Sequence, residues 1–176
     1  MEKRKGIHLC ERIVTSILTR YDVEFVFAGQ DLFGYLSGTL LPALRGRPLR
    51  GKVTALGKLD LRHVRACLRQ ADIFLLPSLW ENCPYSCLEA MAAGRAIVCS
   101  DAGGLPELIR HGQNGLVART GDADSFVAAL ERLIEDRDLR ERLGAEARRT
   151  VERSFTDVEI ARQSVACYEQ CRAQMA

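Results

Sequence analysis

The chain has 176 residues, of which 47% are hydrophobic and 27% charged, and its formal net charge is +2. This length and composition are ordinary for one globular domain with a sizeable core. The small net charge and the scattered Lys and Arg residues argue against nucleic acid as a partner. No apolar run approaches the roughly 18–20 residues that cross a bilayer, and no signal-peptide pattern follows the first six residues.

The cysteines stand at positions 10, 67, 83, 87, 99, 167 and 171, which is an odd number. Most lie inside apolar helix or strand patterns, which indicates reduced thiols in a cytoplasmic protein. Cys83 with Cys87 and Cys167 with Cys171 are spaced i,i+4, and no histidine lies at ligand spacing from either pair. Packed thiols are therefore favoured over a structural zinc, and we expect no metal site.

The first 70 residues alternate between helical and strand patterns. Apolar spacing predicts helices over 7–20 and 39–45, and a third that begins at Asp60 as its N-cap. The inward face of this third helix is expected to hold Leu61, Val64, Cys67 and Leu68. Strands are predicted over 23–28 and 53–56, ended by Gly29 and Gly57.

The stretch 72–90 reads as strand, loop and helix. The wholly apolar run Ile73–Leu76, closed by Pro77 and Ser78, is typical of a buried central strand in a parallel sheet. Helical spacing starts at Tyr85 and runs to about residue 93, with Pro84 just ahead of the first turn, where its missing N–H costs nothing.

The rest of the chain continues the alternation and then becomes helical. Strands are predicted over 96–99 and 116–118, with a glycine-containing turn and a helix opened by Pro106 between them. Because strands and helices alternate, the fold class is α/β, with a parallel sheet and right-handed crossovers. Helices fill the chain from residue 122, and the last, over 157–172, has a broad apolar face that we expect to be buried on more than one surface.

The junction between strand 73–76 and the following helix is the candidate ligand site. In an open α/β sheet, unpaired helix N–H groups and the positive end of the helix dipole face the crevice there. Glu81 lies in the loop with nothing nearby in sequence to pair it, and Glu89 lies one turn into the helix. Glu89 is equally explained as the acid of a capping box with Ser86.

Other candidates keep two interpretations. Lys5, beside Gly6 at a helix start, either reaches an anion in the crevice or belongs to a solvated terminus. Asp101, Gly103 and Gly104 either cradle phosphate or only form a turn, and His63 and His111 are interpreted as surface or satisfied histidines. No dinucleotide-binding fingerprint, Walker loop, Ser-His-Asp set or metal triad is found.

Several motifs occur in a recognisable order: Pro77-Ser78-x-x-Glu81, Glu89-Ala90-Met91-Ala92-x-Gly94, Val98-x-Ser100-x-x-Gly103-Gly104-x-x-Glu107 and Gly112-x-Asn114-Gly115. Over nearly the whole chain, this pattern resembles the donor-binding domain of retaining GT-B glycosyltransferases of family 4. The resemblance implies a Rossmann-like three-layer domain, the C-terminal half of a GT-B fold. It also implies hexosyl transfer from a nucleoside-diphosphate sugar, in polysaccharide or glycolipid biosynthesis and without a further cofactor.

The resemblance also implies residue roles. Glu89 would bind the ribose hydroxyls, Glu81 would hold hydroxyls of the donor sugar, and Lys5 would neutralise the leaving diphosphate. The helix-start residues would meet the sugar and the β-phosphate through their amides, namely Asn82, Cys83, Tyr85 and Ser86. The turn Gly57-Lys58-Leu59 would lie against the nucleobase through its backbone.

Two departures from the family pattern stand out. Cys83-Pro84 replaces a usual Phe-Gly pair, so one amide contact to the sugar is lost. In relatives a strand in the middle of the sheet precedes Lys5-Gly6, and an N-terminal domain carries the acceptor site; both are expected to be missing here. We therefore expect 1–153 to be an N-terminally truncated nucleotide-sugar-binding domain, and 154–176 to be a helix that crosses to the missing domain.

The chain alone is then expected to bind donor weakly and not to catalyse transfer. A cytoplasmic location is expected, with a peripheral place at the inner membrane face as the alternative for the whole enzyme. The alternative function is a non-catalytic interaction module whose 122–174 helices bind a partner protein. Nucleotide-sugar epimerase chemistry is a third, less favoured interpretation.

Overall fold

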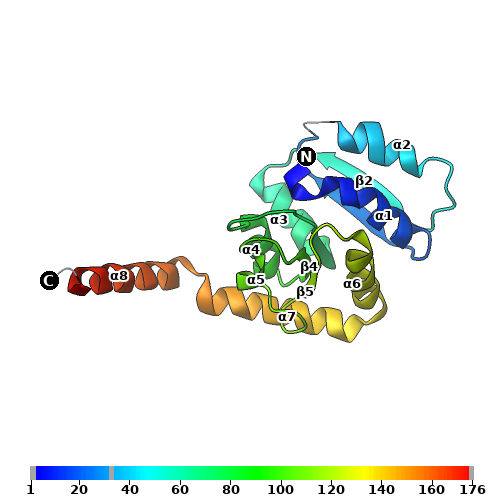
Figure 1. Cartoon of the computed structure of the whole chain (residues 1–176). Helices are drawn as coiled ribbons and strands as arrows, with labels where there is room; N and C mark the ends of the chain where they lie inside the picture. Colours follow the sequence, from blue (N-terminus) through cyan, green and yellow to red (C-terminus); the bar gives the residue numbers. More distant parts are fainter. Residues whose placement is uncertain (1–2, 32–33, 175–176) are drawn as a thin grey trace.

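The computed structural model describes residues 3–31 and 34–174. Its strands are β1 (Glu24–Ala28), β2 (Lys52–Gly57), β3 (Ile73–Leu76), β4 (Ala96–Ser100) and β5 (Leu116–Ala118). Its α-helices are α1 (Cys10–Leu18), α2 (Leu41–Leu44), α3 (Leu61–Gln70), α4 (Tyr85–Ala92), α5 (Leu105–Leu108), α6 (Ala123–Glu135), α7 (Arg137–Ser154) and α8 (Asp157–Gln174). Short helical turns η1 (Lys3–Lys5), η2 (Ile7–Leu9) and η3 (Leu36–Leu40) complete the order (Figure 1).

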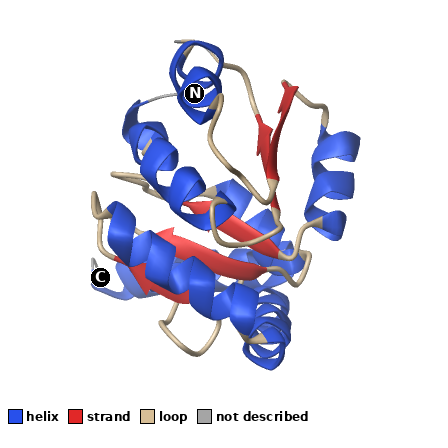
Figure 2. Ribbon diagram, turned by 90° about the vertical axis from the view of Figure 1, so that its right-hand side faces the viewer, coloured by secondary structure: helices blue, strands red, loops and turns tan. Residues whose placement is uncertain are grey.

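All strand pairs are parallel, which confirms the predicted α/β class, but the strands form two sheets. One sheet has the order β1-β2 and the other β3-β4-β5. Among the described residues, no strand pairs with the open edge of β1 or with that of β3. Val23 and Phe25 at β1, and Ile73 and Leu75 of β3, pack against the same core cluster, so both sheets cover one core (Figure 2).

The prediction that β3 is a central, buried strand is wrong. β3 is an edge of its sheet, and three of its four residues are only half-buried. The central strand is β4, which pairs with β3 and β5 and is buried at every residue. The apolar run correctly indicated that side chains of β3 contact the core. It carries no information on how many strands pair with β3.

The strand β4 separates two cores. Ala96 and Val98 face the cluster that contains α1, β5 and α6, whereas Ile97 and Cys99 face the cluster that contains α4 and α5. This alternation follows from the period of two along a strand, and the helices lie on both faces of the sheet (Figure 2). A third cluster, between α1, η3 and α2, packs against the β1-β2 sheet.

Two helix ends follow signals that are local in sequence. The Asp60 carboxylate accepts a hydrogen bond of 2.9 Å from the His63 backbone N–H, which confirms the predicted N-cap of α3. On this helix Leu68 is buried and Val64 and Cys67 are half-buried, but Leu61 is 52% exposed, so its inward placement was wrong. Gly94, at φ 71°, ends α4, as predicted.

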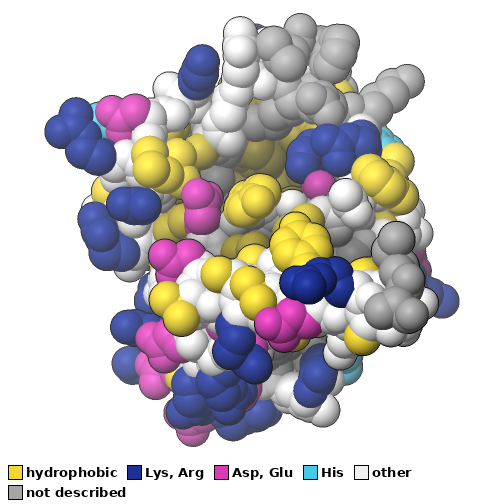
Figure 3. All heavy atoms as spheres, turned by 90° about the vertical axis from the view of Figure 1, so that its left-hand side faces the viewer, with side chains coloured by type: hydrophobic (Ala, Val, Ile, Leu, Met, Phe, Trp, Pro, Cys, Tyr) yellow, Lys and Arg dark blue, Asp and Glu magenta, His cyan; other side chains and the backbone are white. Residues whose placement is uncertain are grey.

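The last helix does not pack as its sequence suggested. α8 projects away from the domain (Figure 1), and none of its residues is buried, so the expected buried face is not formed within the described chain. Its exposed large hydrophobic side chains are Val158, Ile160, Val165 and Tyr168. The side from which α8 projects shows hydrophobic side chains at its centre, with charged ones around them (Figure 3). Within residues 3–31 and 34–174, no helix has the length and apolarity to span a membrane.

Candidate functional site

The candidate site is the segment between β3 and α4, which we call the Glu81 loop (residues 77–84). It leaves the carboxyl end of β3 and ends at Pro84, the N-cap residue of α4, which contributes no side-chain cap. Within the described part of the chain, the backbone N–H groups of Asn82, Cys83, Tyr85 and Ser86 have no hydrogen-bond acceptor. The start of α4 therefore has free N–H donors, which favour a bound anion or oxygen-rich ligand.

Glu81 is the charged centre of this loop, and it is buried. The Lys5 Nζ lies 2.5 Å from its Oε1, and the Ser78 hydroxyl donates to the same oxygen at 2.7 Å. The Arg4 Nη1 lies 3.4 Å from Oε2 and donates to the Trp80 carbonyl at 3.2 Å. The expectation that nothing pairs Glu81 is wrong, because its two cationic partners come from the N-terminal segment, 76 and 77 residues earlier.

These contacts fix the charge state of the site. Burial acts to raise the pKa of Glu81, but hydrogen bonds from Lys5 and Ser78, with the charges of Lys5 and Arg4, hold this pKa below its ordinary value. Glu81 is therefore an ionised carboxylate at neutral pH. The alternative that Lys5 only belongs to a solvated terminus is also wrong, since its ammonium group pairs with the buried Glu81.

The turn after β4, residues 101–104, packs against the backbone of the Glu81 loop. The Gly104 N–H donates to the Glu81 carbonyl at 2.8 Å. A Cβ on Gly103 would lie 2.0 Å from the Glu81 carbonyl oxygen, and one on Gly104 would lie 2.1 Å from that of Asn82. Only glycine permits this approach of two backbones. Of the two interpretations of these glycines, the structure therefore favours turn formation, in a turn that packs against the Glu81 loop.

Asp101 also ties loops together. Its Oδ1 accepts from the Thr120 N–H at 2.8 Å and from the Thr120 hydroxyl at 2.5 Å, which lowers its pKa. The Asp101 side chain thus joins the turns after β4 and β5 through its hydrogen bonds to Thr120.

The second acid, Glu89, is exposed on α4. The capping box with Ser86 is not formed: α4 begins at Tyr85, so Ser86 lies inside the first turn, and no side chain caps the helix. The carboxylate of Glu89 is thus accessible beside the free amides, one turn further along. Tyr85, 76% exposed, and Trp80, 55% exposed, add aromatic surface to the same region.

The turn Gly57-Lys58-Leu59 lies at the carboxyl end of β2, in the other sheet. Gly57 has φ 67°, and its carbonyl accepts from the Gly29 N–H at 2.7 Å. Lys58 is exposed and Leu59 is half-buried. This turn follows the carboxyl end of a strand, as the Glu81 loop does, but it belongs to the part of the fold built on β1 and β2.

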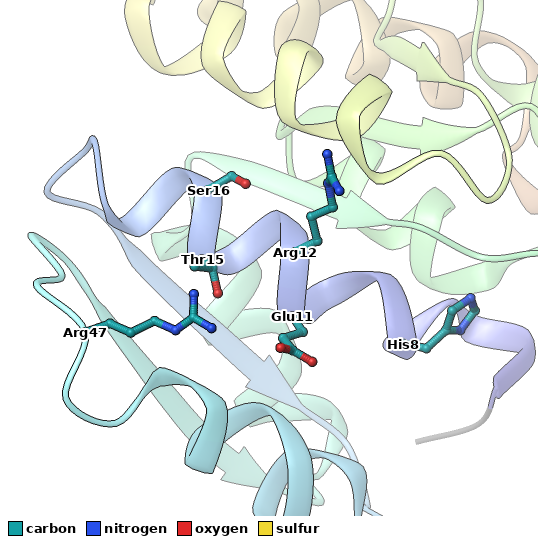
Figure 4. Close-up of a pocket in the computed structure, with 6 residues that line it drawn as sticks. All are labelled: His8, Glu11, Arg12, Thr15, Ser16 and Arg47. Carbon is teal, nitrogen blue, oxygen red and sulfur yellow. The ribbon is translucent and has the colours of Figure 1, made fainter.

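A pocket of about 480 Å³ lies elsewhere, beside α1 and the loop that precedes β2 (Figure 4). It is lined by His8, Glu11, Arg12, Thr15, Ser16 and Arg47. The guanidinium of Arg12 is already paired with the Asp124 carboxylate, at 2.7 Å through two nitrogens. The pocket contains none of the predicted site residues.

No cluster of three or more metal-ligating side chains occurs in residues 3–31 and 34–174, and each cysteine is a free thiol. Cys10, Cys87 and Cys99 are buried in the core as packed thiols, but Cys83, Cys167 and Cys171 are exposed, so the packed-thiol prediction is wrong for these three. Burial raises the pKa of Cys87 to about 12, so this thiol is neutral and inert at the start of α4.

The structure thus brings Lys5 to Glu81, in the loop that leads to the free amides of the α4 start. Two residues of this cluster, Arg4 and Ser78, were given no role at the site. Ser78 carried a signal, because it lies three residues before Glu81, just after an apolar strand. The position of Arg4 beside Glu81 depends on a contact between distant segments, for which the sequence has no signal.

The sequence has recognisable relatives. Residues 1–150 match the model of the family described as glycosyl transferases group 1. An uncharacterised glycosyltransferase of Methanocaldococcus jannaschii is 31% identical over 167 residues, which are 94% of this chain and 42% of that protein. N-acetyl-alpha-D-glucosaminyl L-malate synthase of Bacillus anthracis is 30% identical over 166 residues, with the same two shares.

The fold agrees with these relatives. HepE of Anabaena, in a crystal structure with UDP-glucose, has a TM-score of 0.81 at 22% identity, over 97% of this chain and 46% of HepE. The chain thus spans less than half of the length of the curated relatives that it matches. The parallel α/β layers are those of a GT-B glycosyltransferase domain. On the family match and the relatives together, the chain belongs to the glycosyl transferases group 1 family.

Proposed function

We propose that this chain is the donor-binding, C-terminal half of a retaining family 4 glycosyltransferase of hexosyltransferase type. In this proposal a nucleoside-diphosphate sugar binds at the start of α4. The observation that carries it is the grouping of unsatisfied backbone N–H donors, an ionised acid and two cations at one carboxyl edge of the fold. Such a grouping offers partners to each part of an activated sugar.

The roles follow from the charge of each group. The ammonium group of Lys5 neutralises the negative charge of the diphosphate. The backbone amides of residues 82, 83, 85 and 86 donate hydrogen bonds to the β-phosphate and the sugar. Glu81 accepts from sugar hydroxyls, and Glu89, exposed one turn along α4, accepts from the ribose hydroxyls. The backbone of Gly57–Leu59 lies against the base. Pro84 has no N–H, so the contact that a glycine would supply there is absent.

The chemistry that this site assists is the departure of the diphosphate. As the glycosidic bond breaks, negative charge grows on the leaving oxygen, and cations and aimed N–H dipoles stabilise it. We propose that Lys5, Arg4 and the α4 amides supply this stabilisation without a metal ion. Because Lys5 pairs with Glu81, donor binding exchanges this internal ion pair for contacts to the diphosphate.

The remaining parts of the enzyme belong to the same proposal. The open edges of β1 and β3 are consistent with a further strand between the two sheets, as the family pattern implies. The exposed face of α8 is consistent with an N-terminal domain that carries the acceptor site. The whole enzyme would act in the cytoplasm, or at the inner membrane face, in polysaccharide or glycolipid synthesis.

Calorimetric titration tests the donor site directly. The protein is titrated with UDP, GDP and ADP, in wild-type form and as Glu89→Ala. We expect one nucleoside diphosphate to give saturable binding. Glu89→Ala should weaken its affinity about tenfold or more, because one pair of charge-assisted hydrogen bonds is lost. Lys58→Ala, which also removes an exposed charge, is the comparison variant in the turn that lies against the nucleobase. Equal affinities of wild type and Glu89→Ala would remove the ribose assignment.

A second candidate is a non-catalytic interaction module, and the exposed hydrophobic side chains of α8 favour it. In this case α8 binds a partner protein and the sheets are a scaffold. Nucleotide-dependent thermal stabilisation supports the donor-binding function, because a ligand that binds the native state raises its melting temperature. Its absence, together with a stable complex through α8, would support the interaction module instead.

A further inference from the structure

Two buried serines connect the candidate site to the central strand. Ser100, the last residue of β4, donates its hydroxyl to the Ser78 carbonyl at 2.6 Å. Ser78 in turn donates its own hydroxyl to Glu81 Oε1 at 2.7 Å. Both serines have 0% exposure, and β3 is in register with β4 just before them. The chain of hydrogen bonds therefore runs from the most buried strand of the fold to the acid of the site.

The partners of Glu81 differ in their freedom to move. The side chains of Lys5 and Arg4 are 40% and 43% exposed, and both are long and flexible. An incoming diphosphate therefore competes with Glu81 for them. Ser78 is enclosed and its carbonyl is fixed by Ser100, so it remains with Glu81 when the cations turn to another anion.

The backbone of Glu81 is held separately. The Gly104 N–H donates to the Glu81 carbonyl, and the close approach of Gly103 leaves the loop no space to move toward the turn. With the main chain fixed in this way, the orientation of the carboxylate depends on the groups that contact its two oxygens. A buried hydrogen bond to an ionised acid is strong enough to set that orientation.

We propose that Ser78 is a positioning residue, supported by Ser100, which keeps the Glu81 carboxylate in place for the donor sugar while Lys5 and Arg4 move to the diphosphate. This inference rests on the proposed donor-binding function. It deepens that function, since it assigns recognition of the sugar to a preformed acid and recognition of the diphosphate to the mobile cations. Preorganised groups of this kind make a site selective, because little reorganisation accompanies binding.

The proposal predicts that loss of the Ser78 hydroxyl affects sugar nucleotides more than plain nucleotides. The affinities of UDP-glucose and UDP, and of GDP-mannose and GDP, are measured by calorimetry for wild type, Ser78→Ala and Ser100→Ala. For the pair that wild type binds, we expect Ser78→Ala to reduce the ratio of sugar-nucleotide to nucleotide affinity about tenfold, and Ser100→Ala to reduce it less. Ser78→Thr, which keeps the hydroxyl, should restore the ratio, and Ser164→Ala, on α8, should not alter it.

A second measurement does not depend on any ligand. In protein with carbon-13 in its glutamate carboxyls, NMR titration follows the carboxyl of Glu81, and Ser78→Ala should move its pKa upward relative to wild type. Melting temperatures establish that the variants are folded. Unchanged titration of Glu81 in folded Ser78→Ala, or an unchanged affinity ratio, would overturn the positioning role. The wild type could instead fail to bind any of the four nucleotides while Ser78→Ala shifts the titration of Glu81 as expected. That result would overturn the donor site and leave the contact between Ser78 and Glu81 established.

Discussion

The packing of the 101–104 turn against the Glu81 loop leads to a prediction with a matched control. Gly103 has φ 57° and Gly112 has φ 75°, so alanine at either position must adopt the left-handed conformation. The surroundings of the two glycines differ. A Cβ at Gly103 would lie 2.0 Å from the Glu81 carbonyl oxygen, whereas a Cβ at Gly112 has nothing within 4 Å.

The magnitudes follow from these geometries. The left-handed conformation costs alanine about 1–2 kcal/mol at both sites. Real Cβ atoms essentially never approach another atom within 3.0 Å, so at Gly103 the loop must also move by about 1 Å. Overpacking of this kind typically adds about 1–3 kcal/mol. Since about 1 kcal/mol corresponds to 2–4 °C in a domain of this size, Gly103→Ala should melt roughly 2–12 °C below Gly112→Ala.

Thermal unfolding followed by circular dichroism measures this difference, and NMR shows where the strain goes. In Gly103→Ala the amide signals of Glu81 and Asn82 should shift, and in Gly112→Ala they should not. If the two variants melt at the same temperature and have the same Glu81 and Asn82 amide signals, the turn does not support the Glu81 loop. The account of Gly103 and Gly104 would then be wrong.

Three further predictions concern charge, α8 and the sheet edge. The folded-state pKa of Glu81 lies below its ordinary value of 4.5, so its contribution to stability is complete above that pH and is lost as the pH falls through the folded value. Urea unfolding should therefore show a gap between wild type and Glu81→Gln that narrows on acidification, and a constant gap would contradict this. Removal of residues 157–174 should change the melting temperature by less than about 4 °C, because none of them is buried; a larger loss would show that α8 packs on the domain. Hydrogen exchange should be slower at the amides of β4, paired on both sides, than at those of β3, and equal protection would argue against the open edge of β3.

The regular elements were predictable from the sequence because their signals are local. Apolar runs placed β1, β2, β4 and β5 to within a residue or two, and Asp60 marked the start of α3 by a hydrogen bond that spans only three residues. Family motifs then placed these elements in one fold. The strand-loop-helix unit of the Glu81 loop was found in the same way.

Non-local features were not predictable. The open edge of β3 depends on which strands pair, and the apolar run cannot report that. The two cationic partners of Glu81 lie 76 and 77 positions away, so the sequence showed no charge that could pair this acid. The two interpretations of Gly103 were separated only by the backbone it meets, and the capping box failed because α4 begins one residue before Ser86.

The central claim is that the free amides at the start of α4 hold an activated donor. Its most direct test is a titration of nitrogen-15-labelled protein with UDP, GDP and ADP, followed through the amide signals. The account predicts saturable shifts at residues 82, 83, 85 and 86, which are lost or strongly weakened in Glu89→Ala. Shifts confined to other regions, such as the pocket lined by His8 and Arg47, or identical responses of wild type and Glu89→Ala, would contradict it.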